Sequence, residues 1–139
     1  VFTFLSSAFY LDHVSCPEIE QKSTRPYICV HVNVNGTLFA VPLRSHINHA
    51  HVLWTDKAAG CGLDFSKTVV LAKSSYIDTT RKPHIRQNEF DALRGKEHLV
   101  QQKLVQYIRA YKKAKMRPDI QRNQRLIQYS TLQYFEEFI

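Results

Sequence analysis

A β-hairpin predicted around Asn35-Gly36 constrains the fold more than any other feature of the sequence. The flanking residues 27–33 (YICVHVN) and 37–42 (TLFAVP) are rich in β-branched and aromatic residues, which favour strands. An Asn-Gly pair readily adopts the positive φ angles of a two-residue hairpin turn. We therefore expect the first half of the chain to build a sheet or barrel core.

Two further strands are predicted on either side of this hairpin. Residues 1–10 are apolar but lack the basic leader and small-residue cleavage site of a signal peptide, so they are interpreted as a first strand. Residues 68–72 follow the Gly60-Cys61-Gly62 turn and form an apolar run without alternation. Such a run predicts a strand that is buried on both faces.

After Pro83 the periodicity of the apolar residues becomes helical. A short helix over residues 89–94 would begin after Asn88 as N-cap and end at Gly95. A longer helix is predicted over residues 96–115, and a last one over residues 131–138, where Ser130 and Gln133 match a capping box. Apolar residues of the long helix have the spacing of one buried stripe: Val100, Leu104, Tyr107, Ile108 and Tyr111. Strands followed by helices predict an α+β fold with a small, strongly bent antiparallel sheet or SH3-like barrel and appended C-terminal helices.

Size and composition predict one domain over residues 1–139, because 44% of the residues are hydrophobic and can form a core. No run approaches the roughly 20 apolar residues of a membrane span, so we expect a cytoplasmic protein with no membrane partner. The three cysteines are far apart and form no paired motif, which favours reduced, mostly buried thiols.

The net charge of +7 is concentrated in the second half of the chain. Residues 1–70 contain five basic and five acidic residues, whereas residues 103–125 contain eight basic residues and only Asp119 to oppose them. A local field of this kind attracts polyanions, and nucleic acid is the natural partner. The alternative is a solvated helix face that keeps the protein soluble. The predicted RNA contacts in this region are Lys103, Arg109, Lys112, Lys113, Lys115 and Arg117.

The segment 42–49 (PLRSHINH) is the leading candidate for a chemical site. RNA can be cleaved without a metal, because the 2′-hydroxyl beside the scissile phosphate can attack it in line. The protein then has to align the strand, stabilise charge and manage two protons. Cations, hydroxyls and imidazoles serve these tasks, and this segment concentrates them where a strand ends. The alternative is an ordinary polar loop after an edge strand.

A metal site is a further interpretation of this region, because His46, His49 and His51 are close in sequence. No Cys, Asp or Glu within the segment completes a ligand shell or orients the rings, so we predict neither a metal nor any other cofactor. Lys67 could reach a backbone phosphate from the start of the third strand. Tyr10 and Tyr27 could stack on unpaired bases, with core packing as the alternative.

Several segments together resemble the toxins of type III toxin–antitoxin systems, the ToxN, AbiQ and TenpN group. They are residues 25–30 (RPYICV), the hairpin, and residues 39–45 (FAVPLRS). The PLRS motif followed by His, the GLDFSK segment and the YSTLQYF ending are most similar to the TenpN branch. The likeness covers nearly the whole chain through the order and spacing of these segments.

The resemblance implies a MazF- or Kid-like barrel with appended helices that acts as a metal-independent endoribonuclease in phage defence. Cleavage of host messages would leave a 2′,3′-cyclic phosphate and a 5′-hydroxyl. The toxin would be inhibited by a repeated, pseudoknotted antitoxin RNA that it processes itself, in a ring-like assembly of toxin and RNA.

The resemblance also implies roles for single residues. The serine of the Pro-Leu-x-Ser motif falls on Ser45, and a basic residue ahead of the first hairpin strand falls on Arg25. The ToxN branch has a lysine two positions after the serine, where this chain has Ile47. We therefore expect Arg25 and Arg44 to stabilise the phosphorane and Ser45 to orient the phosphate or the 2′-hydroxyl. His46 or His49 would transfer protons.

Two other functions remain open from the sequence. One is a barrel ribonuclease paired with a protein antitoxin, and the other is a non-catalytic domain that binds RNA or DNA. Tandem short repeats in the upstream DNA would favour an RNA antitoxin, and RNA cleavage in EDTA would exclude the non-catalytic domain.

Overall fold

The hairpin predicted at Asn35-Gly36 is present and forms the centre of the sheet. Strand β2 (Ile28–Val34) pairs with β3 (Thr37–Arg44) in a register that runs from Val34 opposite Thr37 to Cys29 opposite Pro42. Both turn residues have positive φ, 51° at Asn35 and 83° at Gly36. The amide of Gly36 also donates a hydrogen bond to the side chain of Asn33, which closes the turn.

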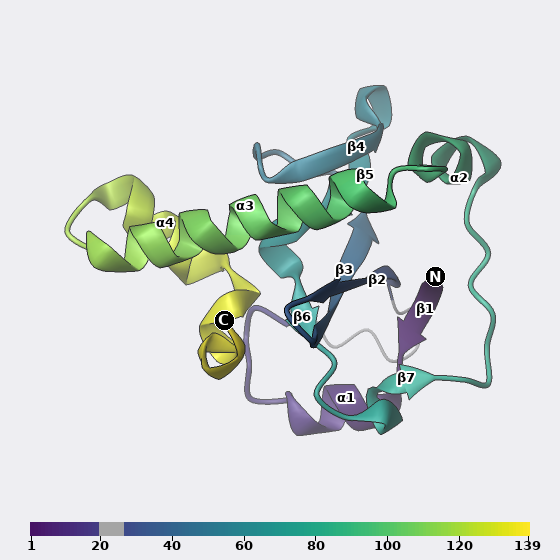
Figure 1. The fold of residues 1–139 in the computed structure, drawn as a ribbon, viewed down its shortest axis with the longest axis horizontal. Coiled ribbons are helices and arrows are strands. Elements are labelled where there is room, and N and C mark those ends of the chain that lie inside the picture. The colour runs from purple at the N-terminus through teal and green to yellow at the C-terminus, as the bar shows by residue number, and fades with distance from the viewer. Residues whose placement is uncertain (20–26) are drawn as a thin grey trace.

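The computed structural model describes residues 1–19 and 27–139, and in this part of the chain the strands form one antiparallel sheet (Figure 1). The strands other than β2 and β3 are β1 (Phe2–Leu5), β4 (Val52–Asp56), β5 (Cys61–Asp64), β6 (Val69–Val70) and β7 (Ile77–Asp78). The strand order is β4-β5-β3-β2-β1-β7, and β6 pairs with β3. The sheet is open, so it does not form the closed barrel that was one of the predicted possibilities.

Strand β3 changes partners along its length. It pairs with β6 at Phe39 and Ala40, and with β5 at Leu43 and Arg44. Next to this junction, β5 passes so close to β4 that a Cβ atom at Gly62 would lie 2.5 Å from the carbonyl oxygen of Leu53, so only glycine fits there. Arg44, the last residue of β3, is thus held between the central hairpin and the β4–β5 pair.

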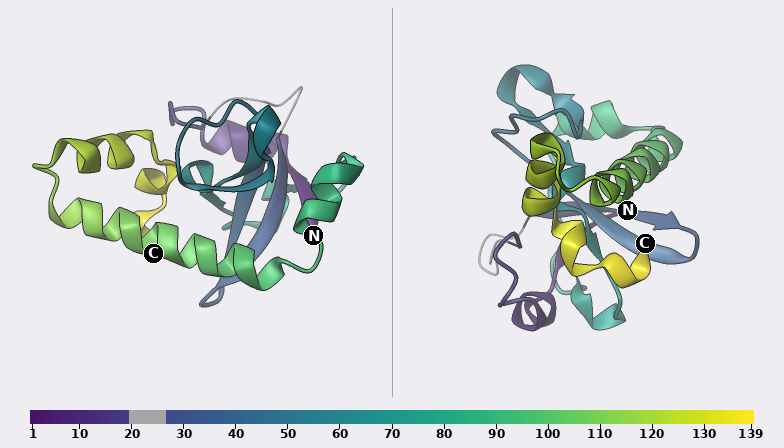
Figure 2. Two further views of the ribbon diagram at one scale, coloured as in Figure 1. Left: turned by 90° about the horizontal axis from the view of Figure 1, so that it is seen from above. Right: turned by 90° about the vertical axis from the view of Figure 1, so that its left-hand side faces the viewer.

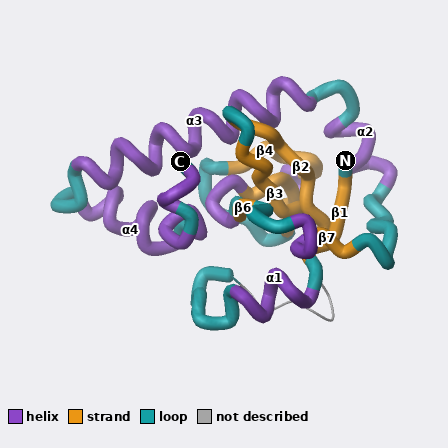
Figure 3. Tube along the Cα trace, turned by 60° about the horizontal axis from the view of Figure 1, so that its bottom comes forward, coloured by secondary structure: helices purple, strands orange, loops and turns teal. Residues whose placement is uncertain are grey.

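The helices lie around the sheet. They are α1 (Ser7–Asp12), α2 (Gln87–Leu93), α3 (Glu97–Met116) and α4 (Gln121–Tyr129). Helix α3 packs across β2, and α1 lies on the other side of the strands (Figure 3). After Pro118 the chain turns back, α4 packs on α3, and the helical pair extends beyond the strands (Figure 2).

The structure confirms the α+β class, the hairpin and the long helix. The predicted stripe on α3 is buried and extends by one turn to Ala114. Helix α2 begins at Gln87, two residues before the predicted start, with Arg86 and not Asn88 at the N-cap position. Residues 68–71 are buried as expected, although the strand itself is only Val69–Val70.

Other predictions are wrong. Residues 1–10 do not form one strand, because β1 ends at Leu5 and the Ser6 hydroxyl accepts a hydrogen bond from the Phe9 amide to begin α1. Strands β4, β5 and β7 were not predicted, and neither was α4. The predicted last helix over residues 131–138 consists of two short 3₁₀ turns, Thr131–Tyr134 and Glu136–Phe138.

No helix among the described residues is both long enough and apolar enough to cross a lipid bilayer. Helix α3 has sufficient length, but basic residues interrupt it.

Candidate functional site

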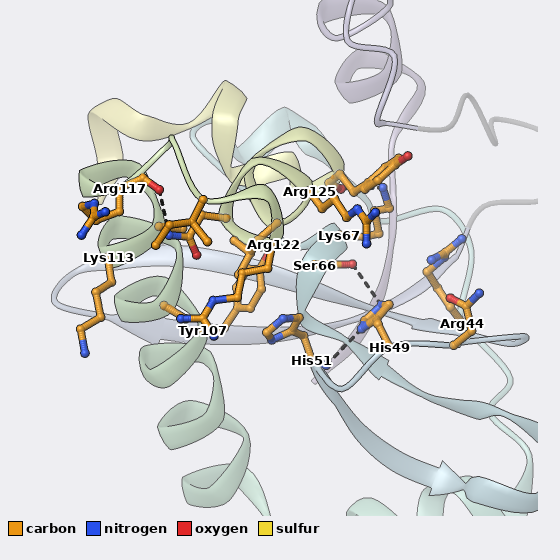
Figure 4. Close-up of a pocket in the computed structure, with 17 residues that line it drawn as sticks. Arg44, His49, His51, Ser66, Lys67, Tyr107, Lys113, Arg117, Arg122 and Arg125 are labelled. Carbon is orange, nitrogen blue, oxygen red and sulfur yellow. Dashed lines mark hydrogen bonds between the residues drawn. The ribbon is translucent and has the colours of Figure 1, made fainter.

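A pocket of about 980 Å³ lies between the loop after β3 and the α3–α4 helical pair. We call it the α3–α4 pocket. Figure 4 shows side chains of the loop on one side and those of the helical pair on the other. The basic residues that line it are Arg44, Lys67, Lys113, Arg117, Arg122 and Arg125. Within the described chain no acidic residue lines this pocket, so its wall can attract and hold a phosphate group.

The basic residues of the pocket differ in how far they are already neutralised. Lys67 donates hydrogen bonds to Glu18 (3.0 Å) and to the carbonyl oxygen of Tyr129 (2.8 Å). Arg117 forms an ion pair with Asp119 (2.9 Å). In the part of the chain that the structure describes, no acidic side chain pairs with the remaining basic residues of the helical pair: Lys113, Arg122 and Arg125. These three are the cations best able to bind an incoming anion.

A buried carboxylate supports the loop side of the pocket. The side chain of Asp64 at the end of β5 is fully buried and accepts hydrogen bonds from Arg44 Nη1 (2.6 Å) and from the Ser66 hydroxyl (2.6 Å). Asp64 Oδ1 also accepts a hydrogen bond from the Ser66 backbone amide (2.9 Å) and lies 3.1 Å from His49 Nε2. Burial would raise the pKa of Asp64, but the hydrogen bonds from His49, Ser66 and Arg44 outweigh it and hold the pKa at about 2. The carboxylate is thus ionised, neutralised by its neighbours and shielded from the pocket.

Both ring nitrogens of His49 are engaged. Its Nδ1 accepts a hydrogen bond from the backbone amide of His51 (3.0 Å), so the proton of the ring is on Nε2, which donates to Asp64. The Ser66 hydroxyl is also 3.3 Å from Nε2. In this arrangement both ring nitrogens of His49 are used to fix the shape of the loop.

His51 presents a different environment. Its half-buried ring lines the α3–α4 pocket and packs edge to face against Tyr107 of α3, with ring centroids 5.2 Å apart. Among the described residues, neither ring nitrogen of His51 has a hydrogen-bond partner. Burial is the main cause that lowers the pKa of His51 below its ordinary value, the neighbouring His49 ring acts in the same direction, and Asp64 opposes this shift. His51 is therefore a largely neutral imidazole that faces a cationic pocket.

Arg44 also lines a second pocket of about 290 Å³, which we call the Ser45 pocket. Ser45 is exposed there, with its hydroxyl 3.1 Å from His46 Nδ1. The Ser45 pocket contains a buried acid, Glu89, which accepts hydrogen bonds from Thr55 (2.6 Å) and Arg86 (3.0 Å). The structure thus places Ser45 and His49 in different pockets that share Arg44.

The other predicted site residues are placed as follows. Arg25 lies outside the described residues. His46 is exposed and has a positive φ of 57°. Tyr10 is only 4% exposed and packs in the core, as the alternative for this residue has it. Tyr27 is half-buried, with its ring 5.5 Å from the guanidinium carbon of Arg44.

The predicted RNA contacts on the long helix divide into two groups. Lys113 and Arg117 line the α3–α4 pocket. Lys103, Arg109, Lys112 and Lys115 lie outside it, and Lys115 is paired with Glu136 (3.3 Å). All of these residues are exposed except Lys103, which is half-buried.

Four residues of the site were not assigned to it from the sequence. Arg122 and Arg125 were counted in the basic run, but their spacing of three residues after Pro118 was not used as a sign of one helix face. His51 was considered as a metal ligand or as a histidine that faces solvent or RNA, and it was not among the predicted catalytic residues. Asp64 was overlooked because it lies on another strand, although it orients the His49 ring and so supplies the acid that the segment 42–49 lacks.

No group of three or more His, Cys, Asp or Glu side chains among the described residues is arranged to hold a metal ion. Comparisons of the chain with protein-family models, with curated proteins and with solved structures found no match. The likeness to type III toxins stays a prediction from the sequence.

Proposed function

We propose that this protein is a metal-independent endoribonuclease, and that it acts in the cytoplasm as the toxin of a type III toxin–antitoxin system. One observation carries the ribonuclease proposal. The α3–α4 pocket combines unpaired cations with imidazole side chains, and its wall carries no acid within the described chain. These are the groups that in-line attack by a 2′-hydroxyl requires. The toxin assignment rests on the resemblance of the segments quoted above.

In the proposed reaction, Arg122, Arg125 and Lys113 bind the RNA backbone and compensate the charge that builds up on the phosphorane. Arg44 lies at the point where both pockets meet, so it can stabilise a phosphate that reaches either one. The pairing of Arg44 with Asp64 fixes the position of its guanidinium before RNA binds. The products would be a 2′,3′-cyclic phosphate and a 5′-hydroxyl.

The basic residues of α3 outside the pocket support a longer RNA contact. Arg109 and Lys112 are exposed on the helix that forms one side of the pocket. They would extend the binding surface beyond the scissile phosphate, as the proposed structured antitoxin RNA requires. Each phosphate that they neutralise would add to the salt dependence of binding.

The direct test is incubation of the purified protein with a short unpaired RNA in EDTA. We expect cleavage products that end in a 2′,3′-cyclic phosphate and a 5′-hydroxyl, and no cleavage of the same sequence with 2′-deoxy sugars. Binding without cleavage would instead identify a non-catalytic RNA-binding domain. Purification after co-expression with the upstream region, followed by sequencing of any bound RNA, separates an RNA antitoxin from a protein antitoxin.

A further inference from the structure

We propose that His51 is the general base of this ribonuclease, and that Asp64 acts through His49 to position it. His51 can have this role only if the protein cleaves RNA as proposed above. Neither His51 nor Asp64 belongs to the catalytic set expected from the sequence. The assignment comes from the hydrogen bonds around the α3–α4 pocket.

The other imidazole of the pocket wall, His49, and the hydroxyls of Ser66 and Tyr107 are engaged in hydrogen bonds. Both ring nitrogens of His49 are occupied, by the His51 amide and by Asp64. The Ser66 hydroxyl donates to Asp64, and the Tyr107 hydroxyl donates to Ser130 (2.7 Å) in the buried interior. Among the described residues, His51 is therefore the imidazole of the pocket wall whose ring nitrogens are available to substrate.

The ring of His51 is also held in place. Its backbone amide donates to His49, and its side chain packs against the Tyr107 ring. Asp64 fixes His49 from behind, so a chain of contacts runs from the buried end of β5 to the pocket surface. A base that is fixed by packing and by a second layer of hydrogen bonds needs little reorganisation when the substrate binds.

The proposed step balances as follows. The unprotonated nitrogen of His51 takes the proton of the 2′-hydroxyl as that oxygen attacks phosphorus. The bond between phosphorus and the 5′-oxygen then breaks, and the leaving oxygen takes a proton from a water molecule. His51 returns its proton to solvent before the next turnover, so protons are conserved overall.

The groups that face His51 make the reaction depend on pH. They are His49 on the same loop, Asp64 on β5, Tyr107 on α3 and the cations of the pocket wall. Burial above all lowers the pKa of His51, so the ring is mainly unprotonated at pH 7 and able to accept a proton. Activity should fall at acid pH as this ring becomes protonated.

The experiment measures kcat/KM for cleavage of a short RNA between pH 4.5 and pH 8. In the wild-type profile, kcat/KM should fall at low pH with the uptake of about one proton, and we call this part of the profile the acid limb. His51→Gln should lower kcat/KM by about 100-fold or more and abolish that limb. It should bind a 2′-deoxy analogue of the substrate within about twofold of the wild type. His98→Gln, at an exposed position on α3, is the matched control and should retain both the rate and the limb.

A second measurement does not depend on how His51→Gln folds. Nuclear magnetic resonance titration of the wild type should show that the pKa of His51 is below its ordinary value. Binding of the 2′-deoxy analogue should raise this pKa, while the signals of His98 should not respond to the analogue. Two results would overturn the assignment of His51 and leave the ribonuclease proposal standing. In the first, RNA is cleaved but His51→Gln keeps the rate and the acid limb. In the second, RNA is cleaved but the His51 signal does not change when the analogue binds. If the wild type cleaves no RNA, both fail.

Discussion

The two pockets that meet at Arg44 differ in charge and in the groups that they offer for proton transfer. Among the described residues, the α3–α4 pocket has basic side chains without an acidic partner and an imidazole with accessible nitrogens, whereas the Ser45 pocket contains Glu89 and a serine close to His46. From the sequence, residues that line the two pockets were expected to belong to one site. The comparison shows that residues close in sequence, such as Ser45 and His49, can face different pockets when the loop turns between them, as it does at His46, where φ is 57°.

The largest expected effect is that of Arg44→Ala, which should damage both pockets. Removal of the guanidinium leaves the fully buried Asp64 carboxylate with two of its three polar partners. Breaking a buried ion pair in this way costs about 3 kcal/mol, so the free energy of unfolding in urea should fall by roughly that amount.

Two variants serve as controls for this effect. Arg44→Lys keeps the charge and should lose less stability, and the double variant Arg44→Ala with Asp64→Asn should recover part of the loss. A decrease below about 1 kcal/mol for Arg44→Ala would mean that the Arg44–Asp64 pair does not support the shared wall.

Acid should destabilise the wall of the α3–α4 pocket through Asp64. Its pKa in the folded protein is about 2, and in the unfolded chain it returns to about 3.9. The stabilisation from the ionised carboxylate is therefore complete above about pH 4 and is lost as the pH falls toward 2. It amounts to on the order of 2 kcal/mol.

Urea unfolding of the wild type and of Asp64→Asn between pH 5 and pH 2 measures this contribution as the difference between the two curves. Other carboxylates titrate in both proteins, so they cancel in the difference. Curves that run parallel over this range would show that Asp64 carries no such linkage.

The smallest effects distinguish the two pockets by RNA affinity. Arg122→Ala and Arg125→Ala should each weaken binding of a short 2′-deoxy analogue by about tenfold. Each should also reduce the slope of log affinity against log salt by about 0.7, because one phosphate contact is lost. Arg94→Ala, at an exposed arginine that forms a pair with Asp91 outside the pocket, should change neither quantity.

Ser45→Ala compares the catalytic roles of the two pockets. The resemblance predicts that this substitution abolishes growth inhibition, whereas the geometry predicts a smaller loss than that of His51→Gln. Growth assays after induction of the two variants, with equal protein levels, decide which pocket holds the scissile phosphate. Full loss in Ser45→Ala alone would assign the chemistry to the Ser45 pocket.

Much of the fold follows from local patterns. The Asn35-Gly36 turn and the apolar stripe of α3 are signals within short segments, so they were found in the sequence and are present in the structure. Helix α4 was missed because its residues are mostly polar and none of them is buried, while Pro118 was interpreted only as the end of the long helix. The short strands β4 and β5 lack the length that makes alternation visible.

The chemistry of the site was only partly visible in the sequence. Local composition was enough to predict a sheet followed by helices, a surplus of cations in the second half, and histidines after the end of a strand.

Which of these groups meet depends on long-range pairing. Leu43 lies opposite Leu63 and Arg44 opposite Gly62. This register brings Asp64, the residue after Leu63, against His49. Hydrogen bonding between strands sets that register, and the return of α4 along α3 then adds Arg122 and Arg125 to the same pocket. Contacts of this kind join segments far apart in the chain, so they are absent from any pattern that a short stretch of residues can carry.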